Sequence, residues 1–531
     1  MNLRFLICLA LLLSPFIQSI ARPIYVSVNR GDDTQDGSSL SKPLKSIQAA
    51  SDQTRPGDTV YIEGGIYESS KKEILKITRS GTEKKWIVYR NLNEDRPVLR
   101  IRSDAGIVLE SVSYISIEGL EITRDVDFYE RTYLGADPDF VTSSGNGIYI
   151  GKVTQKEAMC HHIRIQDNRI HGCPGSGILI HHTDYLTISF NKIHDNGELN
   201  LTNNSGIRLQ QLVDLDQKEG YHIIINGNVI YNQRRLSRLE EEISFCEKTY
   251  SASGISLRDN RYGGSMGQNP GYSSQILVSN NLIYNNGGIG LDLLHTDQVK
   301  AIHNTFFRNN RNAKVQCGEL YGNNISNCVI ANNIFYANTG KPGTRLQNYE
   351  QVEIGHNLYH NCVGYTPGPG DILADPLFVR ANNNESIFDF SLKPKSPAID
   401  AGDKKHTTAY DHAGALRLGG TEVDLGALEY YGSRPLAKNY APAQIDERSI
   451  KLFWQASYVE STRQLLISNH RGRIFSARLY DSRGKLIKQY IQDESSYAGI
   501  EFDLSDYPEG IYFLVAFSDR ERLINRYRVK R

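Results

Sequence analysis

Basic, acidic and imidazole side chains recur at one position of a short repeated phrase, a glycine followed by an apolar–x–apolar step. Successive side chains of a strand point to opposite faces, so the middle residue of each step should point away from the core. The outward residues that follow Gly206, Gly254 and Gly290 include Arg208, Arg258, Asp259, Asp292 and His295. Bases, acids and fixed charges on one surface can move protons and stabilise charged intermediates, so this strip is the candidate site.

Lys314 adds an amine to the same strip. Aligning NAKVQC (residues 312–317) with GIGLDL places Lys314 one coil beyond Gly290, about 8 Å from Asp292 between Cα atoms. In the same alignment Lys314 and Gln316 point outward and Cys317 points inward. A lysine serves as a base where neighbouring charge or burial lowers its pKa. We therefore expect Lys314 and Arg258 to be catalytic.

β-Elimination of a uronate polymer is the reaction that this set of residues suits best. A base removes the proton beside the sugar carboxylate, the glycosidic oxygen leaves, and a cation stabilises the enolate-like intermediate. Arg208 and His295 are the candidate substrate-binding residues. Asp292 and Asp259 are the candidate metal ligands, and Ca²⁺, an ion bound by oxygen atoms, is the expected cofactor.

Two other functions remain open. A glycoside hydrolase needs two carboxyl groups, about 5–5.5 Å apart for retention and about 6.5–9.5 Å apart for inversion. Asp259 and Asp292 lie on consecutive coils and are the candidate pair, although the polygalacturonase signatures Asn-Thr-Asp, Asp-Asp and Gly-His-Gly are absent. A non-catalytic surface protein could also bind a glycan along the same strip.

A second repeat predicts the elements that position this strip. It is a short box of five residues with an asparagine at its second position. It reads DNRIH, FNKIH, GNVIY, NNLIY, HNTFF, NNIFY and HNLYH, with asparagines at 168, 191, 228, 281, 304, 333 and 357. The asparagines recur with a fundamental period near 23 residues, lengthened in places by insertions, which indicates a solenoid. The apolar–x–apolar steps have a period of two residues, which indicates strands. The pattern resembles the right-handed parallel β-helix. Stacked coils superpose identical residues, so we expect these asparagines to form a structural ladder.

Two further segments carry a family resemblance. The opening of the mature chain, from Ile24 to Tyr67, resembles that of secreted β-helical polysaccharide lyases and some β-helical glycosidases. Gly290-Leu291-Asp292, with Lys314 beyond it, resembles the core of polysaccharide lyase family nine, the pectate lyases that use a lysine base. This resemblance implies a lyase with Lys314 as its base and Ca²⁺ bound near Asp292. The chain departs from the family at Gly288 and Ile289, where paired acids are expected.

The fold class expected is all-β, a right-handed parallel β-helix followed by a small C-terminal β-sandwich. Residues 1–21 read as a signal peptide, with an apolar run after Arg4. Residues 22–430 form the β-helix, with a covering helix near residues 44–51 and a closing segment from Asp375 to Tyr430. Residues 431–448 are a linker. Residues 449–531 resemble the sorting sandwich of the type IX secretion route of Bacteroidetes, carried by LYDSRGKLIK and LSDYPEGIYFLVAFS.

Composition agrees with a β-helix, and the chain is long enough for a large core and more than one domain. The chain has 531 residues and a formal net charge of zero, which gives no support for nucleic acid as a partner. No apolar run after the N-terminus approaches membrane-spanning length. We expect a monomer that reaches the cell surface or medium through the periplasm. Six cysteines remain after the signal peptide, mostly as apolar core residues, and their pairing is left open.

Overall fold

The structure is a computed structural model that describes most of residues 21–430 and the strands of residues 454–529. Outside the described residues lie 1–20, 94, 103, 130–144, 152–158, 199–203, 235–251 except Cys246, 262–270, 312–315, 382–387, 415–416, 418–420 and 431–453. In the C-terminal part, 460–463, 470–473, 482–485, 492–499, 505–506, 509, 519–521 and 530–531 are likewise outside.

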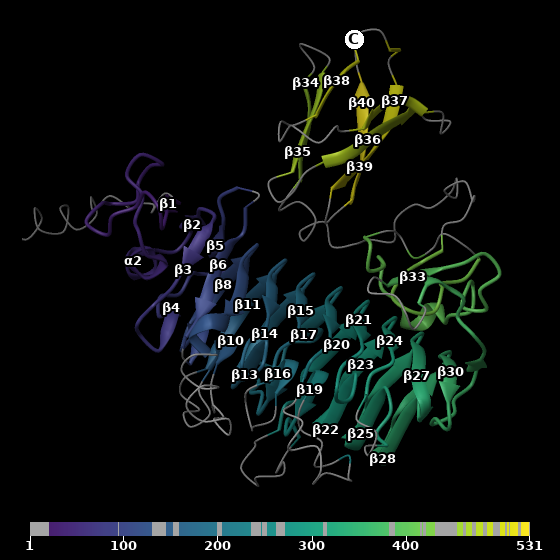
Figure 1. The fold of residues 1–531 in the computed structure, drawn as a ribbon. Coiled ribbons are helices and arrows are strands. Elements are labelled where there is room, and N and C mark those ends of the chain that lie inside the picture. Colours follow the sequence, from purple (N-terminus) through teal and green to yellow (C-terminus); the bar gives the residue numbers. More distant parts are fainter. Residues whose placement is uncertain are drawn as a thin grey trace, which may run out of the picture.

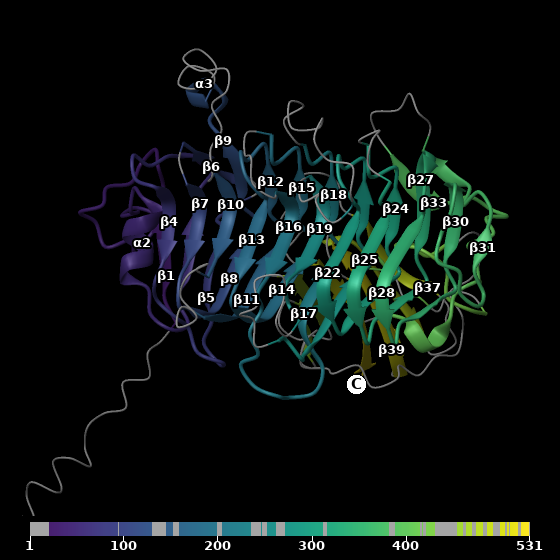
Figure 2. The same cartoon turned by 90° about the horizontal axis from the view of Figure 1, so that it is seen from below.

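Three long parallel sheets make up the body of the protein, and each complete coil contributes one strand to each sheet (Figures 1 and 2). Sheet A contains β1 (Pro23–Val26), β2 (Thr59–Ile62), β5 (Ile87–Asn91), β8 (Ser113–Glu118), β11 (Cys160–Gln166), β14 (Thr183–Ser189), β17 (Tyr221–Asn226), β20 (Gln275–Ser279), β23 (Val299–Ile302), β26 (Val329–Ala331) and β29 (Glu353–Gly355). Sheet B contains β3 (Gly65–Tyr67), β6 (Pro97–Ile101), β9 (Glu121–Arg124), β12 (Arg169–His171), β15 (Lys192–His194), β18 (Val229–Tyr231), β21 (Leu282–Tyr284), β24 (Thr305–Phe307), β27 (Ile334–Lys341), β30 (Leu358–Cys362) and β31 (Ile372–Leu373).

Sheet C completes each coil. It contains β4 (Glu73–Ile77), β7 (Ala105–Leu109), β10 (Asn146–Ile150), β13 (Ile178–His181), β16 (Ser205–Gln210), β19 (Ser253–Arg258), β22 (Leu291–Asp297), β25 (Leu320–Ser326) and β28 (Thr344–Glu350). Every pairing between these coils is parallel, which confirms the predicted β-helix and excludes antiparallel sheets across the described part of residues 145–360.

The core consists of stacked aliphatic residues from the inner faces of the three sheets. On sheet C, Ile178, Ile207, Ile255 and Leu291 occupy equivalent positions on successive coils and are fully buried. Side chains in such a row meet a similar aliphatic residue one coil above and below, so they pack closely along the solenoid. The rigid stack fixes where the outward residues of each coil stand.

The asparagine boxes form the predicted ladder at the turn between sheets A and B. Each side-chain amide donates to the side-chain oxygen of the next asparagine at 2.9–3.1 Å, along Asn168, Asn191, Asn228, Asn281, Asn304, Asn333 and Asn357. All seven are buried. The residue before each ladder asparagine has a positive φ, 56° at Phe190 and 52° at His303 for example, which makes the sharp bend that the ladder stabilises.

A second amide ladder, which the sequence reading missed, stands at the turn between sheets B and C. It runs through Asn196, Gln233, Asn286, Asn309 and Glu319. The first four follow an asparagine of the first ladder by five residues, so the spacing N-x₄-[NQ] was a readable signal. Glu319 ends the row, with Oε2 accepting the backbone N–H and the side-chain N–H of Asn309. Burial raises the pKa of Glu319 to about 8.

Helix α2 (Ile47–Gln53) lies against β1, β2 and β4 at the N-terminal end of the solenoid, as predicted (Figure 1). The Ser46 hydroxyl accepts the backbone N–H of Ala49 and caps the helix at its start. Ile47 and Ala50 are buried, and Ser51 is hydrogen-bonded to Tyr89 at 2.8 Å. The helix therefore covers apolar residues that the first coil would otherwise expose. A second short helix, α3 (Val126–Tyr129), follows β9.

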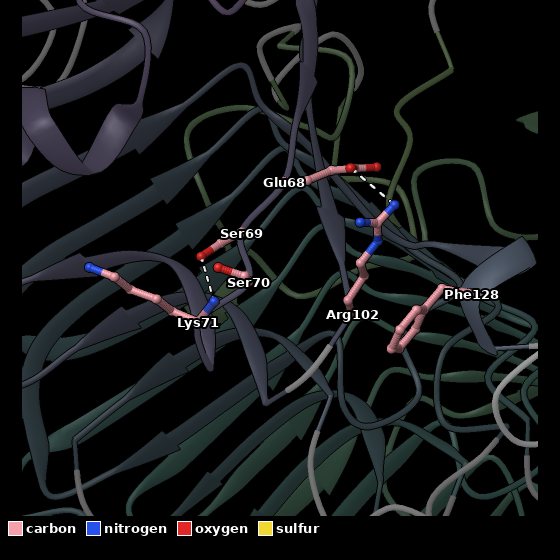
Figure 3. A pocket seen from close by; sticks show the side chains of 6 residues that line it. All are labelled: Glu68, Ser69, Ser70, Lys71, Arg102 and Phe128. Carbon is pink, nitrogen blue, oxygen red and sulfur yellow. Dashed lines mark hydrogen bonds and ion pairs between the residues drawn. The ribbon is translucent and has the colours of Figure 1, made fainter.

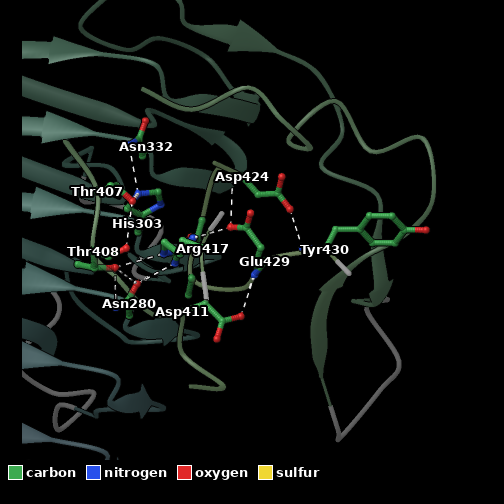
Figure 4. Close-up of polar contacts among 12 residues, drawn as sticks. Asn280, His303, Asn332, Thr407, Thr408, Asp411, Arg417, Asp424, Glu429 and Tyr430 are labelled. Carbon is green, nitrogen blue, oxygen red and sulfur yellow. Dashed lines mark hydrogen bonds and ion pairs between the residues drawn. The ribbon is translucent and has the colours of Figure 1, made fainter. Parts of the chain in front are cut away.

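The closing segment, residues 375–430, follows the last parallel strand. It contains the antiparallel pair β32 (Phe378–Arg380) and β33 (Asp389–Leu392) and a 3₁₀ turn, η4 (Lys404–His406). Its second half packs along the side of the coils, on the turn residues Asn280, His303 and Asn332 (Figure 4).

A buried charge cluster holds that contact. Arg417 donates to the side chain of Asn280 at 2.7 Å and pairs with Glu429 at 3.4 Å. Burial raises the pKa of Asp424 to about 6 and that of Glu429 to about 9. Asp424 and Asp411 accept backbone N–H groups of the segment itself, so these carboxylates hold its turns.

The C-terminal module consists of two antiparallel sheets. One contains β34 (Trp454–Val459), β35 (Gln464–Asn469) and β38 (Ile500–Asp503), and the other β37 (Leu486–Ile491), β36 (Ile474–Asp481), β39 (Gly510–Ser518) and β40 (Arg522–Val529). Leu465, Leu479, Phe502, Leu504 and Leu514 are buried, which confirms the small β-sandwich. The predicted signal peptide and linker lie essentially outside the described residues. Within the described part of the chain, every helix is too short or too polar to span a bilayer.

Candidate functional site on the outer face of sheet C

The candidate residues stand in two rows across the outer face of sheet C. The register pairs Leu179 with Arg208, Arg208 with Ser256, Ser256 with Asp292, Asp292 with Tyr321 and Tyr321 with Arg345. The second row, two residues further along each strand, runs through His181, Gln210, Arg258, Leu294, Asn323 and Gln347. The predicted strip therefore exists, and it brings Arg208, Arg258 and Asp292 onto neighbouring strands.

These residues point away from the coil core, as predicted. They are nevertheless buried, whereas the sequence predicted a solvated face. Arg258 and Asp292 are each 1% exposed, and Arg208 is 7% exposed. Side chains on adjacent coils pack on one another, and Tyr321 also lies in a buried cluster with Ile289, Cys246 and Cys317. The rows are thus a packed polar layer, in which each charge needs a partner.

Arg258, Asp292 and Ser256 form the tightest polar group of this layer. Oδ2 of Asp292 accepts Nε of Arg258 at 2.5 Å and the hydroxyl of Ser256 at 3.0 Å, and it also pairs with a terminal nitrogen of Arg258. Nε of Arg258 lies 3.1 Å from the Ser256 hydroxyl as well. The side chain of Arg258 is therefore held in place by its neighbours Asp292, on the next coil, and Ser256.

Arg208 lies one coil earlier, beside a neutral imidazole. Its Nε donates to the side-chain oxygen of Gln210 at 2.7 Å, and the Gln210 amide lies 3.2 Å from Nδ1 of His181. Burial, reinforced by the charge of Arg208, lowers the pKa of His181 to about 3. His181 is uncharged near neutral pH, so Arg208 carries the positive charge of this corner.

The predicted register of the coil that follows Asp292 is wrong. Leu291 pairs with Leu320 and Asp292 with Tyr321, so the strand of that coil is β25 and not the NAKVQC segment. Cys317 does not enter the core as a strand residue but forms a disulfide with Cys246. Lys314 lies outside the described residues, and its catalytic role stays a prediction. Cys160, Cys173 and Cys328 are buried as free thiols.

His295 and Asp259 lie beside the two rows, on the side that leads to sheet A. Both have a positive φ, 50° and 53°. Nδ1 of His295 lies 2.7 Å from the Asn324 amide, and the backbone N–H of Asp259 donates to Leu294. His295 is half-buried, and its substrate-binding role stays a prediction.

The predicted metal ligands do not fit a calcium site. No group of three His, Cys, Asp or Glu ligands among the described residues includes Asp292 or Asp259. Ca²⁺ takes about 6–8 oxygen ligands, whereas Oδ2 of Asp292 is already occupied by Arg258 and Ser256.

Two clusters elsewhere, each of two carboxylates and one imidazole, have ligand atoms close enough together to hold a metal ion. They are Asp184 with Asp214 and His222, and Glu353 with Asp403 and His406. In the first cluster Asp184 accepts hydrogen bonds from the side chains of Tyr272 and His222 and from the backbone N–H of Leu215. Asp214 accepts hydrogen bonds from the hydroxyls of Ser273 and Ser274. In the second, Glu353 binds Lys405 at 2.8 Å. Protein donors thus already use most of these oxygens.

Two hollows flank sheet C, and the sequence analysis predicted neither. One, of about 460 Å³, is lined by Glu68, Ser69, Ser70, Lys71, Arg102 and Phe128 on the side toward sheet B (Figure 3). There Arg102 pairs with Glu68 at 3.0 Å and with Asp125 at 2.7 Å. The other, of about 570 Å³, lies toward sheet A, and Asp214, Arg261 and Tyr272 are among its lining residues.

Comparison with known proteins gives a family match over most of the β-helix. Residues 24–324, more than half of the chain, match the family described as "Pel9A-like, right handed beta helix region". YwoF of Bacillus subtilis (strain 168), an uncharacterized protein, is 24% identical over 447 residues, which cover 71% of this chain and 92% of that protein.

Two pectate lyases are also similar. The lyase PEL9 of Emericella nidulans is 41% identical over 63 residues, 12% of this chain and 14% of that protein. The crystal structure of pectate lyase Pel9A covers 78% of this chain and 97% of its own, at 17% identity and a TM-score of 0.46.

Proposed function

Because the chain belongs to the Pel9A-like right-handed β-helix family, we propose that it is an exported polysaccharide lyase that cleaves a uronate-containing polymer by β-elimination. The outer face of sheet C is its site. The observation that carries this proposal is the charge of that face. From β10 to β28 its two rows hold Arg208, Arg258 and Arg345 against one carboxylate, Asp292, while His181 is neutral. An excess of fixed positive charge suits an acidic polymer.

The reaction transfers one proton and breaks one carbon–oxygen bond. A base takes the proton beside the uronate carboxylate, its electron pair forms the new carbon–carbon double bond, and the glycosidic oxygen leaves and is protonated. Arg258, held by Asp292, and Arg208 stabilise the negative charge that develops on the carboxylate. Lys314 is the proposed base. It precedes β25, the strand that carries Tyr321 next to Asp292.

An absorbance assay on candidate polymers tests this function. The purified chain is incubated separately with pectate, alginate, glycosaminoglycans and xylan. A lyase produces an unsaturated uronate that absorbs in the ultraviolet, on an acidic polymer and not on neutral xylan. New reducing ends without that absorbance would replace the lyase by a hydrolase. Binding without either product would leave a glycan-binding protein.

Export is the second part of the proposal. The C-terminal sandwich is proposed to direct the chain through the type IX secretion machinery to the cell surface or the medium. Its support is the distinct antiparallel module, which pairs with none of the solenoid strands among the described residues.

A further inference from the structure

In the group formed by Arg258, Asp292 and Ser256, the guanidinium of Arg258 occupies the place beside Asp292 where a metal cation would bind. We propose that the Arg258 guanidinium is a built-in cation at this face, so that the site works without calcium. This inference rests on the proposed lyase function for its catalytic meaning. Its structural part, the exclusion of calcium from Asp292, stands on the contacts alone.

The first argument is steric and electrostatic. A calcium ion bound to Oδ2 of Asp292 would lie about 2.3–2.6 Å from that oxygen. Nε of Arg258 already lies 2.5 Å from it, and the Ser256 hydroxyl lies 3.0 Å away. The ion and the guanidinium carry charges of the same sign. Calcium can therefore bind Oδ2 only if the side chain of Arg258 moves away. That side chain is 1% exposed and packed on all sides.

The second argument is the number of oxygen ligands. Only Oδ1 of Asp292 remains, and among the described residues no donor reaches it. The neighbours of Asp292 across the sheet are Ser256 and Tyr321, neither of which is a carboxylate. Gly288 and Ile289 supply no acid either. Among the described residues Asp292 thus offers calcium a single carboxylate oxygen, whereas the ion takes about six to eight oxygen ligands in all.

The third argument is the cost of keeping this pair. A buried guanidinium–carboxylate pair loses the hydration of both charges and seldom stabilises a protein more than apolar residues of similar volume would. Here the pair stands in the outward row next to Arg208 and not in the core of the coils. A charge that is fixed before substrate arrives can stabilise a developing negative charge without reorganisation. Arg258 therefore supplies fixed positive charge beneath this face, and Asp292 is its positioning residue.

A calcium titration of the full chain tests the structural part directly. The chelator-treated wild-type protein and its Asp292→Asn variant are titrated with CaCl₂ in a calorimeter. We expect no saturable calcium site that the substitution removes. A stoichiometric site present in the wild type and lost in Asp292→Asn would overturn the inference. This measurement needs no substrate, so it gives its result even if no polymer is cleaved and the proposed function fails.

Kinetics on the cleaved polymer test the catalytic part. The wild-type rate should be the same with chelator and with added CaCl₂, and strict calcium dependence would contradict the inference. Arg258→Ala should lower kcat/KM about 100-fold, mainly through kcat, because the cation acts on the transition state. Soluble guanidinium should restore part of the rate, whereas CaCl₂ should not. Rescue by CaCl₂ instead of guanidinium would show that a metal serves this position.

A matched control separates chemistry from stability. Arg96 pairs with Asp167 at 3.0 Å at the turn between sheets A and B, away from the two rows of sheet C. Arg96→Ala removes an Arg–Asp pair and should keep the rate. Circular dichroism reports whether each variant is folded. If Arg258→Ala does not fold, Arg258→Lys keeps the charge without the guanidinium fork, and it should retain calcium independence with a lower kcat.

Discussion

At the scale of single residues, the chemistry of this face depends on which charges neutralise each other. Arg258 and Asp292 are close enough to bond, and their pairing occupies Oδ2 of Asp292, an oxygen that a metal or a sugar would otherwise meet. Arg208 lies one coil before Arg258, and the neutral His181 lies two coils before it. A list of residue types cannot reveal such pairing, because the partner of each side chain is on another coil.

Lys314 is the residue whose role is most directly measured. If it is the base, Lys314→Ala should lower the rate of unsaturated-product formation by about 10²–10⁴-fold, because the general base contributes roughly that factor. Lys300→Ala is the control, since Lys300 lies on β23 of sheet A, away from the candidate face. Full activity in Lys314→Ala would transfer the base role to another group.

Glu319 should make the stability of the fold depend on pH. Burial raises its pKa from 4.5 to about 8, so between these values the folded protein keeps a proton that the unfolded chain releases. The free energy of unfolding should therefore fall as pH rises across this window, by at most about 1.4 kcal/mol per pH unit. Glu319→Gln resembles the protonated form and should remove this slope in denaturant titrations at pH 5, 6.5 and 8. An unchanged slope would mean that Glu319 is ionised in the folded protein.

At the scale of elements, the coils are held in register by their turns as much as by their strands. One amide ladder stands between sheets A and B and the other between sheets B and C. The asparagine repeat made the first ladder predictable because one residue type recurs at one bend. The register of β25 was not predictable, since both NAKVQC and GELYGN offer an alternating pattern, and only pairing with β22 selects the second.

Breaking the first ladder in its middle should destabilise the solenoid. In Asn228→Ala, the backbone N–H of Asn191 loses its acceptor, and the carbonyl of Ile188 loses a donor. Each buried group left unsatisfied costs about 1–3 kcal/mol, so a loss of about 3 kcal/mol is expected. Thermal unfolding measures it against Asn93→Ala, because Asn93 is exposed. Equal melting temperatures for the two variants would show that the ladder adds no stability.

At the scale of the whole molecule, the chain divides into a parallel solenoid and an antiparallel sandwich. The closing segment belongs to the solenoid, because its residues bond to Asn280, His303 and Asn332 on three coils (Figure 4). Among the described residues, none of these contacts comes from the sandwich. We therefore expect the β-helix with its closing segment to fold without residues 449–531.

Deleting residues 449–531 tests both the division and the proposed export route. The truncated chain should keep its β-sheet spectrum and its activity, because the deletion removes no described contact of the candidate face. In the native host, cell fractionation should find it in the periplasm and not at the surface. A shortened protein that reaches the medium normally would exclude a sorting role for the sandwich.

The sequence by itself determined the repeat, the parallel strands, the structural asparagines, the helix that covers the first coil and the face that carries Arg208, Arg258 and Asp292. These follow from local periodicity, since a side chain's face depends on its place within its own strand. Only the tertiary structure decided that this face is buried, that Arg258 neutralises Asp292, that Cys246 bonds to Cys317 and that β25 follows β22. Each of these depends on which coils become neighbours, and insertions of varying length between the repeats hide that from the sequence.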